Sequence, residues 1–277
     1  MYDALQKRNC VKLILKNMKR AWQIGNILSL LFALVANFLV GAQLLNLPAI
    51  GQISDKYTTL LTPAGYAFSI WSLIYLLLIV FIVYQARDIL KPRKQNTLPQ
   101  AIGPFFIISS LGNGIWTYLF VKEYIGLSVI VILLLTASLY AILAKLRIAT
   151  YSAPFSTIAF VWWPLLIYTG WVSVASIVNI ASWLESLEVA VSPIIASAIL
   201  VGLLAILIML LIKRNVRELL LASAWGIIAI GMQQVGMVNG NRLVATTAFG
   251  VGGMLIVAAS VHAYKNRHAS ILVKLRH

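Results

Sequence analysis

The sequence predicts an all-α integral membrane protein with eight transmembrane helices. Hydrophobic residues make up 61% of the chain and charged residues only 10%, and the mean hydropathy is +0.92. Soluble domains carry about 25% charged residues. The charges also cluster between long apolar runs, and these runs can supply the ~20 residues that a spanning helix needs. No soluble domain fits between them.

Eight apolar runs are candidate spans. We predict helices over residues 25–47, 66–86, 102–121, 126–144, 157–183, 191–212, 217–237 and 243–264. The fifth run is longer than a simple span requires, and Pro164 lies inside it. Because proline removes one backbone donor, we expect a kink or tilt near Trp163.

The basic residues orient these spans. With the N-terminus in the cytoplasm, 19 of the 22 Lys and Arg residues fall in inside segments, and only Lys56, Lys122 and Arg242 fall outside. Lys and Arg are retained on the cytoplasmic side of membranes. The excess of Lys and Arg on the cytoplasmic side recurs at every successive loop. An incorrect helix count would not give this alternation. Both termini are therefore predicted to be cytoplasmic.

The net charge of +15 is explained by this topology. The cations are spread over five short segments at membrane boundaries, so we predict no nucleic-acid partner. The predicted partner is the lipid bilayer. The N-terminal basic stretch fits a solvated tail and a contact with anionic headgroups equally well. The sequence leaves a homodimer open.

Four regions follow from the distribution of residue types. We predict a basic cytoplasmic tail over 1–24, a five-helix bundle over 25–183, a three-helix extension over 184–264 and a second basic tail over 265–277. Seven of the eight tryptophans precede residue 184. The extension instead carries small residues suited to close helix packing. Gln233, Gln234 and His262, near its helix ends, are predicted to be hydrogen-bonding residues.

Groups for catalysis or ion coupling are missing from the spans. All seven acidic residues fall at helix ends or in loops, and the three histidines lie in the last 16 residues. Ion-coupled carriers usually need a buried ionisable group, and a metal site needs clustered ligands. We therefore predict neither an enzyme nor an energised transporter, and no metal or resident cofactor.

Three spans repeat one polar and aromatic face at positions i, i+3 and i+7, within an arc of roughly 80° on a helix. The faces are Phe68, Trp71 and Tyr75; Asn113, Trp116 and Phe120; and Tyr168, Trp171 and Ala175, followed by Asn179. Indoles stack on flat π-systems, and amides bond polar edges of a ligand. The alternative is that these residues are interfacial aromatics and interhelical amides. Trp162, Trp163 and Trp183 are predicted to belong to such an interfacial belt.

The same segments resemble the TspO/MBR family of translocator proteins and tryptophan-rich sensory proteins. Phe68 to Tyr75 is similar to F-x-x-W-x-x-x-Y of the family's second helix, and Asn113 to Phe120 to N-x-x-W-x-x-x-F of its third. Pro164 to Asn179 is similar to the fifth-helix pattern P-x-x-x-Y-x-x-W-x-x-x-A-x-x-x-N. The resemblance covers about residues 25–183. The last three helices lie outside the short pattern and resemble the longer bacterial members.

The resemblance implies a five-helix bundle around a pocket for tetrapyrroles, sterol-like or other flat hydrophobic molecules. The site residues that it implies are Trp71, Tyr75, Asn113, Trp116, Tyr168, Trp171 and Asn179. The chain departs from the family after Tyr75, where Leu76 to Val80 replace a glycine-containing turn. It also departs after Asn179, where Glu185 and Glu188 stand in place of a sterol-type Y-x-K/R tail. These departures argue against cholesterol as the ligand.

Three functions follow as hypotheses. The first is a receptor or regulator in the plasma membrane, the bacterial inner membrane, that binds a porphyrin-like ligand in the bundle. The second is a passive transporter or exporter of such molecules, with the extension completing a path. A slow porphyrin-degrading activity, implied by the family alone, ranks last because no acid and base pair supports it.

Overall fold

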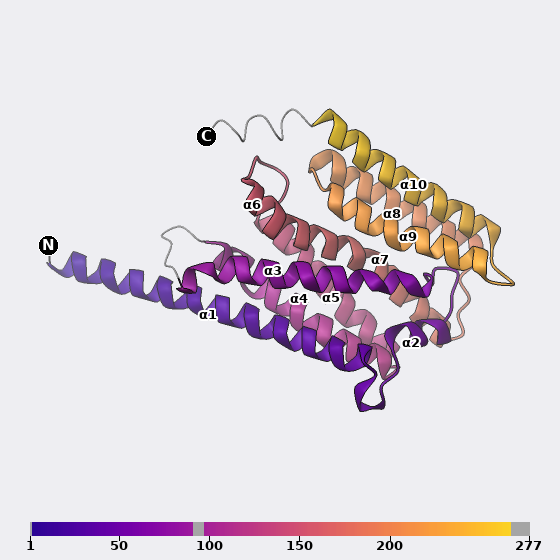
Figure 1. Ribbon diagram of the computed structural model, residues 1–277, viewed down its shortest axis with the longest axis horizontal. Helices are drawn as coiled ribbons and strands as arrows, with labels where there is room; N and C mark the ends of the chain where they lie inside the picture. Colours follow the sequence, from indigo (N-terminus) through magenta and orange to yellow (C-terminus); the bar gives the residue numbers. More distant parts are fainter. Residues whose placement is uncertain (1, 91–96, 267–277) are drawn as a thin grey trace.

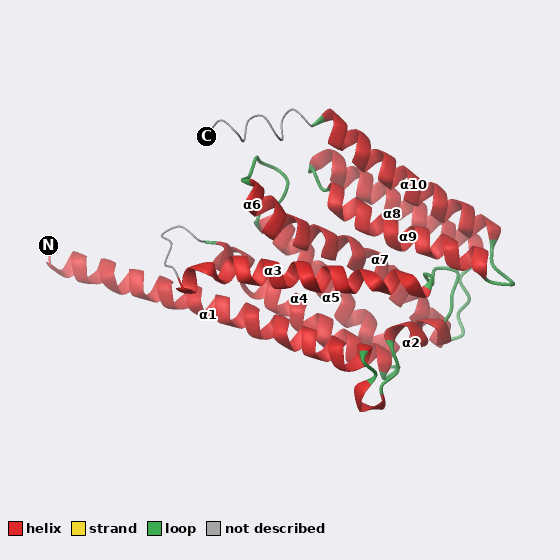
Figure 2. Cartoon of the chain, in the orientation of Figure 1, coloured by secondary structure: helices red, strands yellow, loops and turns green. Residues whose placement is uncertain are grey.

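The computed structural model describes residues 2–90 and 97–266, and all regular secondary structure in them is helical (Figure 2). Eight helical segments are long and apolar enough to cross a membrane. They are Asn17–Gly41, Gly65–Arg87, Leu98–Val121, Ile125–Lys145, Phe155–Ser186, Pro193–Lys213, Arg217–Gly236 and Arg242–Lys265. The predicted helix count is confirmed. Residues 267–277 of the predicted C-terminal tail lie outside the described residues.

The first helix differs from the prediction at both ends. Helix α1 runs over Tyr2–Gly41, so residues 2–24 of the predicted tail are helical and continuous with the first span. At 1.5 Å per residue its 40 residues measure about 60 Å. Its N-terminal part extends past the other helices (Figure 1). The span also ends at Gly41 and not at residue 47, because the left-handed residues Gln43 and Asn46 turn the chain there.

The external connection between the first two spans contains a short helix that the sequence did not reveal. The 3-10 turn η1 (Leu44–Asn46) leads through Pro48 into helix α2 (Ile50–Lys56). The 3-10 turn η2 (Gly65–Ser69) then leads into α3 (Ile70–Leu90). Seven residues give too short a hydrophobic pattern to separate α2 from a loop.

Helix α4 (Leu98–Val121) begins before the predicted residue 102 and bends near its start. Gly103 has a φ of 45° and precedes Pro104. Because proline cannot donate to the preceding turn, and glycine has no Cβ to oppose a left-handed φ, the bend forms at this pair. Helix α5 (Ile125–Lys145) follows after a tight turn at Glu123.

The fifth span is irregular close to the predicted position. It comprises α6 (Phe155–Thr157), the π-helical turn η3 (Ile158–Trp162) and α7 (Trp163–Ser186). Pro164 lies in the first turn of α7, so the widened turn directly precedes the residue that lacks a backbone donor. The expected irregularity near Trp163 is therefore a π turn.

The last three spans are α8 (Pro193–Lys213), α9 (Arg217–Gly236) and α10 (Arg242–Lys265). Within the first five spans, α1 packs on α4, α4 on α5, and α5 on α7. Helix α7 also contacts α3 and α9, and α10 lies against both α9 and α8 (Figure 1). Helix α7 thus joins the bundle to the extension.

Several hydrogen bonds tie the extension to the bundle. Trp225 Nε1 donates to the Ala67 carbonyl at 3.0 Å, and Gln234 Nε2 donates to the Leu60 carbonyl at 3.2 Å. The backbone of Ala64 donates to Ala229 at 2.9 Å. The predicted hydrogen-bonding role of Gln234 is confirmed, but its partners lie in the loop after α2 and just before α10 and not in another helix. These bonds hold the segment that leads into α3, so the extension supports the aromatic face of that helix.

Candidate functional site

The three predicted faces meet around the indole of Trp71 on α3. Tyr75 stacks on Trp71 with ring centroids 5.4 Å apart and planes 17° from parallel. Trp116 of α4 lies 6.0 Å from Trp71, and Tyr168 and Trp171 of α7 each lie 6.1 Å from it. Offset and edge-to-face contacts at these separations are favourable. The structure therefore brings the predicted aromatic residues into one cluster.

The amide of Asn113 joins the cluster to α1. Its Oδ1 accepts hydrogen bonds from Asn37 Nδ2 at 2.7 Å and from the Tyr75 hydroxyl at 3.2 Å. Thr117 donates to Asn37 Oδ1 at 2.8 Å. The oxygen of Asn113 is thus used within the protein, whereas its buried Nδ2 makes no hydrogen bond. Asn37, which the sequence reasoning missed, holds this network on the α1 side.

Asn179 is a structural partner of the cluster. Its Oδ1 accepts from Trp116 Nε1 at 2.7 Å, and its Nδ2 donates to Ser128 Oγ of α5 at 2.9 Å. The side chain is 2% exposed, so both of its polar atoms are used inside the protein. Asn179 therefore fixes the Trp116 indole against α5 and α7 rather than presenting a free amide. Sequence reasoning could not identify Ser128 as a partner of Asn179, because a lone serine is common in membrane spans.

Two indole nitrogens of the cluster have no partner. Trp71 Nε1 and Trp171 Nε1 are buried and make no hydrogen bond. Leaving a buried donor unpaired costs about 1–3 kcal/mol. A ligand that offers an oxygen or nitrogen acceptor between α3 and α7 would remove this cost.

The cluster borders a small chamber. The chamber has a cavity volume of only about 20 Å³ and is lined by residues of α2, η2, α3, α4 and α7, among them Ile50, Phe68, Trp71, Trp116 and Trp171. A cavity needs roughly 10–15 Å³ to hold one water molecule, so the chamber has room for about one water and for no larger molecule. A planar ligand can enter only if these rings move.

A larger groove lies beside the chamber. It has a volume of about 610 Å³ and is bounded by α1, α2 and α3, with Asn37, Ile50, Phe68, Trp71 and Tyr75 among its residues. Ile50, Phe68 and Trp71 line both spaces. They lie between the groove and the chamber. Small-molecule sites usually measure 300–1,000 Å³, so the groove has the volume of a binding site.

Charged residues hold α2, one wall of this groove, from outside the spans. Lys56 and Tyr57 both bond the carboxylate of Glu123, which lies between α4 and α5. The hydrogen bond from Lys56, with a second from Tyr57, lowers the pKa of Glu123. The same bond raises the pKa of Lys56. The pair therefore keeps α2 against the bundle while both groups are charged.

One of the expectations for tryptophans outside the cluster is wrong. Trp162 is 7% exposed and packs edge-on against Tyr151, so it is not a residue of an exposed interfacial belt. Trp225 of α9, for which the sequence predicted no contact, packs on Tyr66 and bonds Ala67. Trp183 is 38% exposed, as an interfacial residue would be. Burial of these rings depends on neighbouring helices that a local pattern cannot identify.

The fold and this cluster define an all-helical, multi-pass integral membrane protein of a ligand-binding or transport type. A family model described as TSPO-like protein matches residues 23–261. The chain belongs to this family. The match runs from α1 into α10, so the three last helices are part of the matched family pattern and not an addition to it. No curated protein and no solved structure gives a significant match to the chain.

Proposed function

We propose that the protein is a membrane receptor or regulator that binds a porphyrin-like or other planar hydrophobic molecule beside Trp71. The observation that carries the proposal is the convergence of aromatic faces from α3, α4 and α7 on one indole, with two unpaired indole N–H groups. Stacked rings supply dispersion and apolar burial, and the free donors suit a carboxylate or carbonyl edge.

The groove and the chamber have different parts in this proposal. The ligand first occupies the space between α1, α2 and α3, where the stacked Trp71 and Tyr75 rings offer an aromatic wall. Movement of Ile50, Phe68 and Trp71 then joins this space to the chamber. In this complex Trp71 and Trp171 contact the ligand, whereas Tyr75, Asn113, Trp116, Tyr168 and Asn179 position them.

Quenching of intrinsic tryptophan fluorescence tests binding directly. Titration of the purified protein with a panel of tetrapyrroles should give saturable quenching with micromolar affinity, which corresponds to about −8 kcal/mol. An equal quenching curve for the Trp171→Phe variant would point to nonspecific partition into the detergent. Absence of quenching by every planar ligand would refute the proposal.

The competing function is passive transport of the same molecules across the bilayer. It is favoured by the attachment of α8, α9 and α10 to the segment that leads into α3, since movement there would reach the aromatic cluster. A flux assay in proteoliposomes separates the two functions. A receptor gives saturable binding without transfer of the ligand, and a transporter accelerates its transfer.

Non-enzymatic action, residence in the plasma membrane and assembly as a homodimer complete the proposal. Porphyrin incubated with the protein should be recovered unchanged by absorbance spectroscopy. Cross-linking in native membranes tests the dimer.

A further inference from the structure

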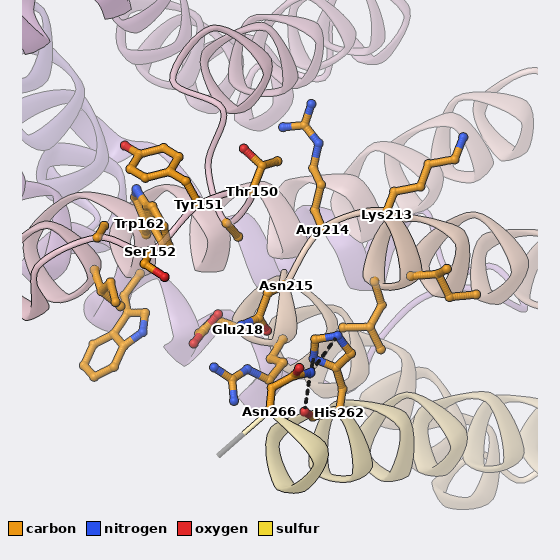
Figure 3. A pocket seen from close by; sticks show the side chains of 17 residues that line it. Thr150, Tyr151, Ser152, Trp162, Lys213, Arg214, Asn215, Glu218, His262 and Asn266 are labelled. Atoms are coloured by element: carbon orange, nitrogen blue, oxygen red, sulfur yellow. Dashed lines mark hydrogen bonds between the residues drawn. The ribbon is translucent and has the colours of Figure 1, made fainter. Parts of the chain in front are cut away.

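A second cavity lies at the opposite, cytoplasmic end of the molecule. It has a volume of about 340 Å³ and is formed by the loop after α5, the start of α7, the connection between α8 and α9, and the end of α10 (Figure 3). It shares no residue with the aromatic chamber or the groove. At about 30 Å³ per water it holds roughly ten water molecules, which is enough for a compact polar group.

Residues that line this cavity carry both kinds of unpaired buried polar atom. Trp163 Nε1 and Arg217 Nε are donors without an acceptor, and Asn215 Oδ1 is an acceptor without a donor. Buried polar atoms are normally paired. Donors and an acceptor without partners among the residues of one cavity point to a ligand that both accepts and donates hydrogen bonds.

The cavity also contains charged side chains of both signs. The lining includes the guanidinium of Arg217 and the carboxylate of Glu218, and Glu218 forms no ion pair with another described residue. Arg214 already has a partner within the protein, since its Nη1 donates a hydrogen bond to the Leu143 carbonyl at 3.0 Å. Figure 3 shows Lys213 and Arg214 extending away from the group formed by Asn215, Glu218 and His262. One cation and one anion therefore remain for a ligand, which favours a zwitterion over a simple anion.

The position of the cavity indicates the source of such a ligand. Helix α8 ends at Lys213, α9 begins at Arg217 and α10 ends at Lys265, so the cavity lies at the boundary between the spans and the cytoplasm. Ile212 on its rim is 78% exposed, which suits contact with acyl chains. A phospholipid of the inner leaflet can place its headgroup in the cavity while its chains remain in the bilayer.

We propose that this cavity binds the phosphoethanolamine headgroup of a phospholipid. The phosphate accepts hydrogen bonds from Arg217 and Trp163, and the ammonium donates to Glu218 and to Asn215 Oδ1. An ammonium has three N–H donors, whereas a trimethylammonium has none, so a choline headgroup cannot satisfy Asn215. A glycerol headgroup lacks the cation that pairs with Glu218. The cavity therefore selects ethanolamine over choline and glycerol lipids.

Native mass spectrometry of the delipidated full-length protein tests the selection. The protein is titrated with phosphatidylethanolamine, phosphatidylcholine and phosphatidylglycerol that carry identical acyl chains. We expect the ethanolamine lipid to bind about tenfold more tightly than either of the others, as one charge-assisted hydrogen bond provides. Equal retention of all three lipids would overturn the proposal.

Two variants assign the selectivity to the cavity. Arg217→Gln should weaken binding of all three lipids, because the phosphate loses its cation. Glu218→Gln should abolish the preference for ethanolamine over glycerol lipid, because the carboxylate that attracts the ammonium and repels an anionic headgroup is gone. Arg20→Gln, which removes an exposed cation of α1 on the same side of the membrane, is the matched control and should leave selectivity unchanged. A loss of selectivity in this control would assign the effect to general surface charge.

Two further measurements separate a lipid from a soluble ligand, and loss of binding from loss of folding. In the first, thermal unfolding is measured with free O-phosphoethanolamine and with the lipid. If both protect the protein equally, the ligand is a soluble zwitterion, and the lipid assignment is overturned. Arg217→Lys keeps the positive charge and is used if Arg217→Gln does not fold; retained lipid selectivity is then expected. Tetrapyrrole quenching in these variants reports the aromatic site independently.

Discussion

The bundle and the extension bury their helices by different means. In the bundle, α3, α4 and α7 meet through large rings and side-chain amides, which leave a small chamber and unpaired N–H groups. Where α9 meets α7 and α10, the helices approach closely at small residues: Gly170 and Gly252 have no room for a Cβ, and Gly226 has little. Small residues let helix backbones approach closely and leave little space. In the proposed complex the aromatic rings move to admit the ligand, whereas the glycine interface holds α7 close to α9.

The largest expected effect concerns the glycine interface. A Cβ at Gly170 would strike the carbonyl of Leu219 on α9, whereas a Cβ at Gly202 meets no atom within 4 Å. Gly170→Ala should destabilise the protein by about 1–3 kcal/mol through overpacking. Gly202→Ala should be neutral or stabilising by up to about 1 kcal/mol, because alanine is the better helix former. Thermal unfolding in detergent measures both, and equal effects would mean that α9 does not approach α7 closely.

A comparable loss of stability is expected at Asn179, on the aromatic side. Asn179→Leu leaves the buried Trp116 Nε1 without its acceptor at 2.7 Å, and Ser128 without its partner. The cost of an unsatisfied buried donor is about 1–3 kcal/mol. We expect a lower melting temperature even without ligand. An unchanged melting temperature with lost ligand affinity would instead make Asn179 a direct ligand contact.

A smaller effect, confined to ligand binding, is expected at Trp171. Its Nε1 has no partner in the protein, so Trp171→Phe removes no internal hydrogen bond. Affinity for a planar ligand should fall by about 0.5–1.5 kcal/mol through lost stacking. Trp22→Phe in α1, outside the cluster, is the control for the loss of one fluorophore. Lower stability with unaltered affinity would show that Trp171 acts in packing alone.

The smallest effect is expected at the charged contact that holds α2. The folded pKa of Glu123 is lowered by Lys56 and Tyr57, so the contribution of this carboxylate is present above its unfolded pKa and lost as the pH falls through the lowered value. The pKa of Lys56 is raised, so its contribution disappears only at alkaline pH. The difference in melting temperature between the wild type and Glu123→Gln should be positive near neutral pH and vanish in acid. A difference that persists in strong acid would exclude the ion pair as its cause.

The aromatic motifs could be predicted from the sequence because they repeat with the helical period on single helices. Trp71 and Tyr75 share a face wherever α3 lies, with Phe68 in the 3-10 turn η2 just before it, and Asn113, Trp116 and Phe120 share a face of α4. The roles of the amides could not be predicted in this way. Asn113 bonds Asn37 and Asn179 bonds Ser128, and these partners stand 76 and 51 residues away in the chain. A pattern on one helix does not show which polar atom faces it from another.

The sequence by itself determined the membrane class, the number of spans and the position of the irregularity near Pro164, because bilayer thickness and backbone hydrogen bonding act on each segment locally. Only the tertiary structure decided that α9 packs against α7, that Trp225 and Gln234 support the segment leading into α3, and that the aromatic rings leave only a small chamber between them. It also brought Trp163, Asn215, Arg217 and Glu218 to one cavity at the other end. These features depend on which helix faces meet, and helix faces are chosen by packing between segments that lie far apart in the chain.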